Sequence, residues 1–344
     1  MSAAVGPTAA SGRRDAGAQA GPDGQTSAQA LAVRTAVRRK QRWRERRTIL
    51  VLLSPGLVGL AVFFLYPLAA NVFYSFTRYN LIDAASWAGL ANYRFMFDGD
   101  HQIGPALRNT VLFCLVAVPI QLLFALGVTA VLARIRSGAG VYRPLFYLPT
   151  LLPPVAATLA FTFVLNPGTG PVNTVLKAIG VPQPLWFNSP TWSKTALLLL
   201  TMWGIGNTIV ILLAATLDVP EELQEAAQLD GANGRQRYWH ITLPTIAPVL
   251  LFSTIIGVIQ SLQLFTQPYV VSTILGSGSG TTANNLGYPQ NSMLFFTEVL
   301  YQQGFRYFNM GYASALSVVL FVATLVVTGV LILVTRRQMN AERD

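Results

Sequence analysis

The sequence predicts an all-α membrane protein with six transmembrane helices and with both termini in the cytoplasm. Three observations predict this class. The residues are 52% hydrophobic and only 11% charged, six apolar stretches are long enough to cross a bilayer, and the basic residues gather on one side of them. Soluble domains carry about 25% charged residues. With so little charge, a chain of 344 residues cannot cover a globular surface with polar groups, so lipid is its expected solvent.

Each apolar stretch approaches the roughly 20 residues that a helix needs to cross the hydrocarbon core. The six spans are expected near Thr48–Ala70, Val111–Ala133, Leu145–Leu165, Ala196–Leu217, Ile246–Val271 and Tyr312–Val334. The third stretch contains Pro149, Pro153 and Pro154, which free backbone carbonyls and kink a helix. We therefore treat the third stretch as the one that is open to a partly re-entrant path.

The basic residues predict the orientation of the spans. With the N-terminus in the cytoplasm, 18 of the 24 Lys and Arg residues fall inside and six fall outside, as the positive-inside rule requires. The inside set contains the ten that precede Thr48 and Arg134, Arg136, Arg143, Arg235, Arg237, Arg336, Arg337 and Arg343. The outside set is Arg78, Arg94, Arg108, Lys177, Lys194 and Arg306. The dense basic block at 34–47 adjoins a span, so it favours contact with anionic lipid over nucleic-acid binding.

Two regions are expected along the chain. Residues 1–44 form a basic cytoplasmic tail, whose first part is rich in Ala, Gly, Ser, Gln and Pro without hydrophobic periodicity. Such a segment cannot bury enough apolar surface to offset its ordering entropy, so we expect it to be disordered. Residues 45–340 form the six-helix transmembrane domain, which includes a cytoplasmic segment at 218–244.

Acidic residues and histidines lie outside all six stretches, since none of them contains any of the fourteen acidic residues or either histidine. Proton-coupled carriers commonly place such groups inside their spans, so this distribution argues against a proton-coupled carrier, although a sodium site of carbonyls and hydroxyls stays open. The Gly-rich stretch at 276–282 lacks the Lys of a phosphate-binding Walker A loop. We expect no catalytic residue, no metal site and no cofactor in this chain, and a separate protein must supply any energy.

The cytoplasmic segment between the fourth and fifth stretches, Asp218–Pro244, is the most informative part of the chain. Asp218 is expected to cap a short helix that has Pro220 and two glutamates in its first turn. Gly231 is expected to end this helix. A second short helical segment at 235–240 then leads into the fifth stretch. Together they predict a helical elbow that stands off the membrane.

A spaced motif occupies this elbow: E-A-A, three residues, G, nine residues, then I-x-L-P. Its members are Glu225, Ala226, Ala227, Gly231, Ile241, Leu243 and Pro244. The motif resembles the EAA loop of ATP-binding cassette importer permeases, which docks into a groove of the ATPase. The resemblance covers the chain from about Arg44 to its C-terminus and implies the type I importer fold. Phe265–Tyr269 and Leu300–Leu320 are similar to the carbohydrate-uptake branch, which includes the maltose and glycerol-phosphate permeases.

This resemblance implies several partners. They are a second homologous permease, two copies of an ATPase that binds the ATP, and an extracytoplasmic solute-binding protein, assembled at the cytoplasmic (inner) membrane. It also implies a coupling helix between the fourth and fifth spans. The residues implied to contact the ATPase or transmit its movement are Glu225, Ala226, Ala227, Asp230, Gly231, Ile241, Leu243 and Pro244.

The resemblance further implies that the cargo is a sugar, with a di- or oligosaccharide expected. Sugars are held by amides, hydroxyls and aromatic faces, and the fourth and fifth stretches offer Trp203, Gly204, Asn207, Gln260, Ser261, Gln263, Gln267 and Tyr269. Gly204, Asn207 and Ser261 are similar in position to sugar-contacting residues of the maltose permease. The polar members can instead form interhelical hydrogen bonds that hold the bundle together.

Two departures from the family leave the solute open: the long loop GSGSGTTANN after the fifth stretch, and glutamines where maltose permeases favour asparagines. Glycerol phosphate or another small polar solute is the alternative cargo. A phosphate would need a cation on the path, and none lies inside the six stretches.

Overall fold

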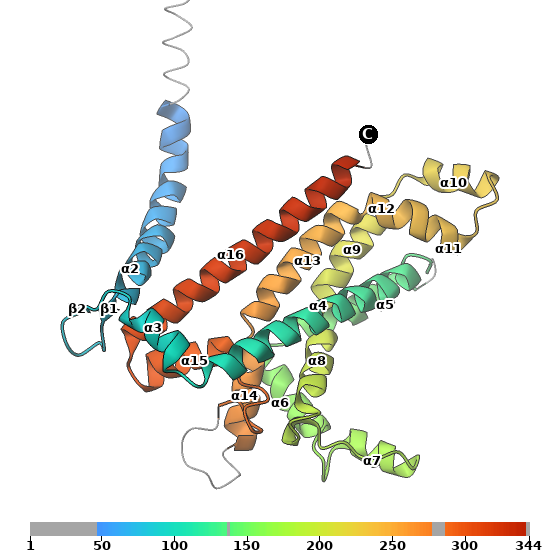
Figure 1. Ribbon diagram of the computed structural model, residues 1–344. Helices are drawn as coiled ribbons and strands as arrows, with labels where there is room; N and C mark the ends of the chain where they lie inside the picture. Colours follow the sequence, from blue (N-terminus) through green and yellow to red (C-terminus); the bar gives the residue numbers. More distant parts are fainter. Residues whose placement is uncertain (1–46, 136–137, 277–285, 342–344) are drawn as a thin grey trace, which may run out of the picture. The chain divides into compact units, whose positions relative to one another are not determined.

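The computed structural model describes residues 47–135, 138–276 and 286–341 (Figure 1). The tail predicted at 1–44 and most of the Gly-rich stretch at 276–282 lie outside these residues. The chain divides into two units, Met1–Leu68 and Ala69–Asp344. The described part of the first unit is an apolar helix that starts at Arg47. Leu52 and Phe63 expose 75% and 76% of their surface on it, as expected of a helix that faces lipid.

Helices dominate the second unit. The α-helices from its start to the segment at 218–244 are α2 (Tyr66–Ser75, which begins in the first unit), α3 (Ala91–Asp98), α4 (Ile103–Leu132), α5 (Ala139–Tyr147), α6 (Pro154–Val164), α7 (Pro171–Ala178), α8 (Ser193–Trp203) and α9 (Gly206–Leu217). Those that follow are α10 (Glu221–Leu229), α11 (Gly234–Arg237), α12 (Leu243–Thr245), α13 (Ala247–Leu262), α14 (Thr266–Gly276), α15 (Phe296–Tyr301) and α16 (Met310–Ala341). Short 3₁₀ turns lie at Leu148–Leu151 and Trp186–Asn188.

Four described helices are long and apolar enough to cross a membrane: Arg47–Ser75, Ile103–Leu132, Ala247–Gly276 and Met310–Thr335. Two further pairs qualify only when their members are taken together. They are Gly140–Leu151 with Pro154–Val164, bent by 98°, and Ser193–Trp203 with Gly206–Leu217, bent by 50°. The protein is thus mostly helical, with four to six candidate spans.

The break in the third stretch follows from its prolines. Leu152, just before Pro153, is extended with a ψ of 134°, the conformation that a residue before proline prefers. The third stretch also begins earlier than expected, at Gly140 rather than Leu145. The 50° break in the fourth stretch was not anticipated, since Ala196–Leu217 reads as one continuous apolar run.

One element departs from the all-α prediction. Strands β1 (Thr77–Arg78) and β2 (Ser86–Trp87) pair antiparallel, with Thr77 opposite Trp87. The intervening turn is held by the Asn80 side-chain oxygen, which accepts hydrogen bonds from the backbone amides of Ile82 and Asp83. A short polar side chain can organise a turn in this way without any hydrophobic pattern.

Helix α4 is the central element of the second unit, where it packs against α9 and α13. One buried cluster joins Ala125 and Leu132 of α4 to Ile209, Leu212 and Leu213 of α9. At the other end of α4, Asn109 donates to the backbone oxygens of Asn291 and Leu294 at 2.8 and 3.0 Å. These bonds fix the segment that leads into α15 onto α4.

Glu298 of α15 is fully buried outside the candidate spans. Its Oε2 accepts a hydrogen bond from the Phe295 amide at 3.0 Å, while Oε1 has no hydrogen-bond partner among the described residues. Burial raises the pKa of this carboxyl from 4.5 to about 8, although the Phe295 amide and the positive charge of Arg306 oppose the shift. The sequence gives no sign that Glu298 is buried, because a carboxylate outside the apolar stretches is expected to be exposed.

Candidate solute cavity and EAA loop

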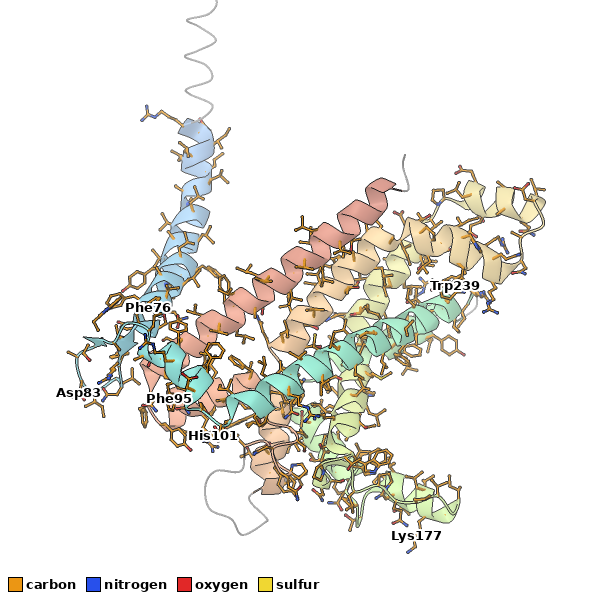
Figure 2. All side chains as sticks on the ribbon, in the orientation of Figure 1. Phe76, Asp83, Phe95, His101, Lys177 and Trp239 are labelled. Carbon is orange, nitrogen blue, oxygen red and sulfur yellow. The ribbon has the colours of Figure 1, made fainter. Side chains whose placement is uncertain are left out.

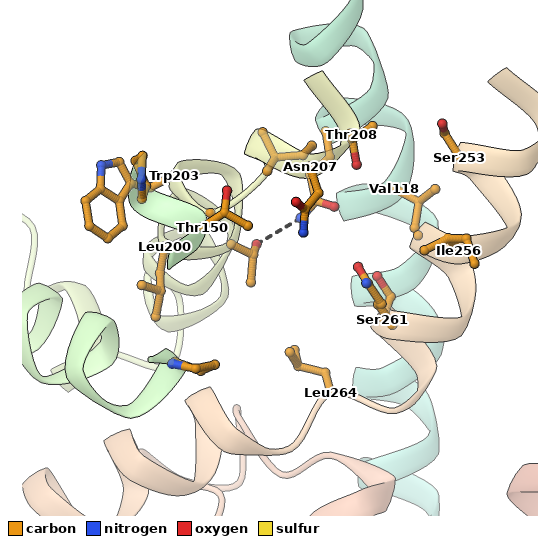
Figure 3. A pocket seen from close by; sticks show the side chains of 18 of the residues that line it. Val118, Thr150, Leu200, Trp203, Asn207, Thr208, Ser253, Ile256, Ser261 and Leu264 are labelled. Carbon is orange, nitrogen blue, oxygen red and sulfur yellow. Dashed lines mark hydrogen bonds between the residues drawn. The ribbon is translucent and has the colours of Figure 1, made fainter. Parts of the chain in front are cut away.

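The second unit contains a partly open cavity of about 1090 Å³, lined by residues of α4, α5, α6, α8, α9, α13 and the start of α14. Figure 3 shows Thr150, Asn207, Ser253 and Ser261 on the walls of this space, between apolar side chains such as Leu200 and Leu264. A mostly apolar wall with a few polar groups is typical of small-molecule sites.

The structure gathers most of the residues that the sequence nominated for the solute path. Those that line the cavity are Trp203, Gly204, Asn207, Gln260, Ser261, Gln263 and Gln267. Tyr269 is not among the lining residues. Its ring stacks on Phe265 with centroids 5.1 Å apart, and its hydroxyl lies 3.5 Å from that of Tyr301, so it joins α14 to α15 instead.

The polar candidates are not used to hold helices together. Within the described part of the chain, the side chains of Asn207, Gln260, Gln263 and Gln267 make no hydrogen bond, whereas Gln121 of α4 donates to Thr201 of α8 at 3.0 Å. Amides that are not engaged with neighbouring helices remain able to bind a solute. This arrangement favours solute contact over the alternative of interhelical bonds.

Trp203 contributes an aromatic face at the cavity wall. Its ring lies 5.4 Å from that of Phe161, at an interplanar angle of 49°, and 39% of the side chain is exposed. The tilted contact with Phe161 fixes the position of the indole without covering it.

Gly206 allows two walls of the cavity to meet. A Cβ atom at this position would lie 2.6 Å from the Phe146 carbonyl oxygen and 3.0 Å from Tyr147 Cα, and it would also overlap Thr150 Oγ1. Only glycine therefore allows the start of α9 to approach the end of α5 this closely.

Sequence reasoning missed several polar residues of the cavity, namely Gln121, Arg143, Thr150, Thr201, Thr208 and Ser253. Arg143 matters most, because the sequence indicated no cation on the path. Since α5 begins at Ala139, Arg143 lies inside the helix that forms the wall. The sign that could have revealed it is that Arg143 lies only two residues before the predicted third span.

The segment between the fourth and fifth stretches forms helices α10, α11 and α12, joined by a π-helical turn at Tyr238–Thr242. We call Asp218–Pro244 the EAA loop. Asp218 does not cap α10 as expected. It ends α9, and Pro220 occupies the N-cap position of α10. Gly231 does end the helix, with a φ of +81° that favours glycine.

A cap that the sequence analysis overlooked starts α11. The Asn233 side chain accepts from the amides of Arg235 and Gln236, and the Gln236 side chain accepts from the Asn233 amide. This reciprocal capping box is visible in the sequence as Asn-x-x-Gln.

The parts of the EAA loop are tied to one another and to the bundle. Gln224 of α10 donates to Thr242 at 3.1 Å, and Arg237 donates to the Gln228 side chain at 3.3 Å. The Tyr238 hydroxyl donates to the backbone oxygen of Leu126 in α4 at 3.3 Å, and burial raises the pKa of this phenol. The loop therefore contacts α4 as well as continuing into α13.

The outer surface of the EAA loop is open. Glu225, Ala226, Asp230, Gly231 and Pro244 are exposed, while Ala227, Ile241 and Leu243 are half-buried. Leu229 of α10 is 90% exposed, an unusual position for a large apolar side chain. Figures 1 and 2 show α10, α11 and Trp239 at one end of the bundle, beyond the helices that line the cavity.

Comparison with known proteins agrees with this geometry. Residues 109–340 match the sequence profile of the family described as binding-protein-dependent transport system inner membrane component. The chain belongs to this family. The permease is 35% identical over 280 residues to the probable ABC transporter permease protein YesP of Bacillus subtilis, covering 81% of this chain and 87% of that protein.

A second relative is the sulfoquinovosyl glycerol transport system permease protein SmoG of Agrobacterium fabrum. It is 33% identical over 296 residues, covering 85% of the permease and 91% of that protein. The fold is also that of a chain in the crystal structure of a bacterial alginate ABC transporter in complex with alginate pentasaccharide-bound periplasmic protein. The TM-score is 0.73 at 19% identity, with 86% of the permease and 96% of that chain covered.

These findings confirm that the chain is an integral membrane permease subunit of an ATP-binding cassette importer. Because permease subunits of this family are transport components without catalysis of their own, the prediction of a non-enzymatic role is confirmed as well.

Proposed function

We propose that this permease translocates a sugar, in particular a di- or oligosaccharide, into the cell, driven by a separate ATPase. The observation that supports a sugar is the cavity of about 1090 Å³, whose wall carries amides that make no bond within the described chain and the exposed face of Trp203. Such groups suit hydroxyl-rich solutes. One relative is named for the transport of sulfoquinovosyl glycerol, which is a sugar derivative, and this name supports the same class of cargo.

The proposed architecture has six transmembrane helices, each bent pair forming one span, with both termini in the cytoplasm of a cell whose cytoplasmic (inner) membrane holds the protein. Residues 1–44 form the basic tail and residues 45–340 form the transmembrane domain. The distribution of Lys and Arg supports this orientation, and it puts the EAA loop at 218–244 on the cytoplasmic side.

We assign the coupling role to the EAA loop, with α10 as the helix that enters a groove of the ATPase. Glu225 offers a charged contact, Ala226, Ala227 and Gly231 permit close packing, and Asp230 lies at the exposed end of α10. Ile241, Leu243 and Pro244 attach the loop to α13.

In this mechanism the assembly contains a second homologous permease, two ATPase copies and an extracytoplasmic solute-binding protein that delivers the sugar. ATP binding closes the ATPases, and each EAA loop follows its groove as a rigid body. The movement rocks the two permeases from an inward-facing to an outward-facing arrangement.

Solute contacts in this scheme fall to Trp203, Gly204, Asn207, Gln260, Ser261, Gln263 and Gln267. Tyr269 remains in the set only as a neighbour, because its hydroxyl and ring are occupied by Tyr301 and Phe265. Glycerol phosphate or another small polar solute is the second candidate cargo, and the presence of Arg143 at the cavity wall favours it.

The test is Glu225→Lys in the complete transporter reconstituted with its ATPase, partner permease and solute-binding protein. We expect sugar uptake to be lost while membrane insertion is normal. Asp98→Lys makes the same charge change at an exposed site at the end of α3, outside the EAA loop, and should retain uptake. Normal uptake by the Glu225 variant would remove the docking role from this loop.

A further inference from the structure

The β1–β2 hairpin ends in two large apolar side chains that the described part of the chain leaves largely uncovered. Leu81 and Ile82, which we call the hairpin tip, expose 50% and 85% of their surface. Turns favour Gly, Asn, Asp, Pro and Ser, so two adjacent large apolar residues are unusual there. Leu81 also has a φ of +68°, which is uncommon for a bulky residue. The hairpin tip is therefore apolar where neither solvent nor the local backbone favours it.

The hairpin is attached where two candidate spans end. The span Arg47–Ser75 has 29 residues and is therefore about 43 Å long, which matches the roughly 40–45 Å of a bilayer with its head groups. Strand β1 begins two residues later, and Asn92 of α3 donates to backbone oxygens at the end of this span and in β1, at 2.8 and 2.9 Å. The amide of Gly311, the second residue of the last span, donates to the Tyr79 oxygen at 3.0 Å. The hairpin therefore lies at the level of the head groups.

The close fit of the hairpin against the last span depends on Gly311. A Cβ atom at this position would overlap the Thr77 carbonyl oxygen, so glycine is needed for the approach. Figure 1 shows β1 and β2 beside α3 and the start of α16, which pack together. The hairpin is thus fixed to the ends of the spans and cannot swing away from the membrane surface.

The exposed apolar surface of the first span continues onto the hairpin. Phe73 of α2 is 55% exposed, and its ring lies 6.4 Å from that of Trp87 in β2, which is 70% exposed. Phe76 stacks on the same indole at 5.8 Å and fixes its position. Tryptophan is enriched at the boundary between membrane and water. Because the surface is continuous with a helix that faces lipid, lipid rather than water or a second protein is its expected cover.

We propose that the hairpin tip inserts into the nearest lipid leaflet, with the side chains of Leu81 and Ile82 below the head groups and Trp87 among them. The insertion is shallow, because backbone polar groups need partners inside a bilayer. At the tip, the amides of Ile82 and Asp83 already have one, the Asn80 side-chain oxygen. In the proposed orientation this is the extracytoplasmic leaflet. The inference concerns lipid and is independent of the solute that the permease carries.

The test places a bimane label at the hairpin tip of the complete transporter in nanodiscs, with partner subunits that lack cysteine. Ile82→Cys is labelled in a chain whose one native cysteine, Cys114, is replaced by alanine. Ser86→Cys is the matched control, because Ser86 is exposed and lies on the opposite face of the ribbon from Trp87. Iodide quenches a label that is in contact with water, and a nitroxide on the lipid acyl chains quenches a label inside the leaflet.

We expect the label at position 82 to be quenched by the acyl-chain nitroxide and to lose most of the iodide quenching seen at position 86. If iodide quenches both positions equally, the hairpin tip lies in water and the inference is wrong. Shielding that appears only after the solute-binding protein is added would overturn it in favour of protein docking. Shielding from iodide without quenching by the nitroxide would overturn it in favour of packing on the partner permease. ATP hydrolysis by both labelled transporters shows that they are folded, and no outcome depends on solute uptake.

Discussion

Replacing Gly206 by alanine tests whether the close approach of α9 and α5 shapes the cavity. The added Cβ would have to move from 2.6 Å to about 3.4 Å from the Phe146 carbonyl oxygen before the contact became ordinary, and it would also press on Thr150. Both neighbours belong to a proline-containing segment that packs against α9, so a flexible side chain cannot relieve the overlap. Overpacking of this kind costs about 1–3 kcal/mol, offset by at most about 1 kcal/mol from the better helix propensity of alanine.

We therefore expect Gly206→Ala to lower the free energy of unfolding by about 1–2 kcal/mol. It should also reduce uptake, because Ile205 and Asn207 beside it line the cavity. Equilibrium unfolding in mixed detergent micelles measures the first effect and flux into proteoliposomes the second. The matched control is Gly127→Ala, a position inside α4 that does not line the cavity and where no atom lies within 4 Å of a new Cβ. Wild-type stability of the Gly206 variant, or an equal loss in the control, would refute the reasoning.

Two more predictions concern the EAA loop and α15. Tyr238→Phe removes the hydrogen bond to the Leu126 backbone oxygen, so we expect the free energy of unfolding to fall by about 1 kcal/mol and fewer solute molecules to be moved per ATP hydrolysed. Tyr142→Phe, at an exposed ring of α5, is the control. An unchanged ratio of solute moved to ATP hydrolysed would contradict the role of the bond. For Glu298, the folded-state pKa of about 8 exceeds the ordinary 4.5. The unfolded state therefore releases its proton first, and between about pH 5 and 8 stability falls by up to about 1.4 kcal/mol per pH unit. Glu298→Gln should remove this fall in pH-dependent unfolding curves, and an unaltered slope would show that the carboxyl is not neutral in the folded protein.

The spans could be placed from sequence because apolar length and flanking charge determine them. The sixth was expected at Tyr312–Val334 and is found at Met310–Thr335. The second begins earlier than expected, at Ile103 rather than Val111. Asn109 and Thr110 lie before the predicted second span, but both are buried. Asn109 donates to the Asn291 backbone oxygen in the segment before α15, and Thr110 accepts from the amide of Phe296, the first residue of α15. Hydrogen bonds between residues far apart in the sequence produce no periodic pattern along the chain, so the sequence does not predict them.

The candidate site was likewise predicted in part from the sequence. The EAA motif is local, so its spacing could be recognised, yet the capping of α10 was misassigned because Asp218 and Pro220 both suit a helix start. The nominated residues near Gly204 and Gln260 do line the cavity. Arg143, Thr150 and Ser253 could not be associated in advance, because Arg143 and Thr150 precede the bend of the third stretch while Ser253 lies on α13, and only tertiary packing makes all three line the cavity.

The attachment of the EAA loop at two places has a consequence for energetics. The loop continues covalently into α13 and reaches α4 through Tyr238, and these two helices supply cavity residues such as Gln260 and Gln121. A displacement of the loop thus alters the spacing of those residues without a long chain of intermediates. In the proposed docking of α10 on an ATPase, thermodynamic reciprocity requires that an occupant of the cavity change the affinity of the ATPase for α10 by the same factor by which the ATPase changes the affinity of the cavity for the occupant.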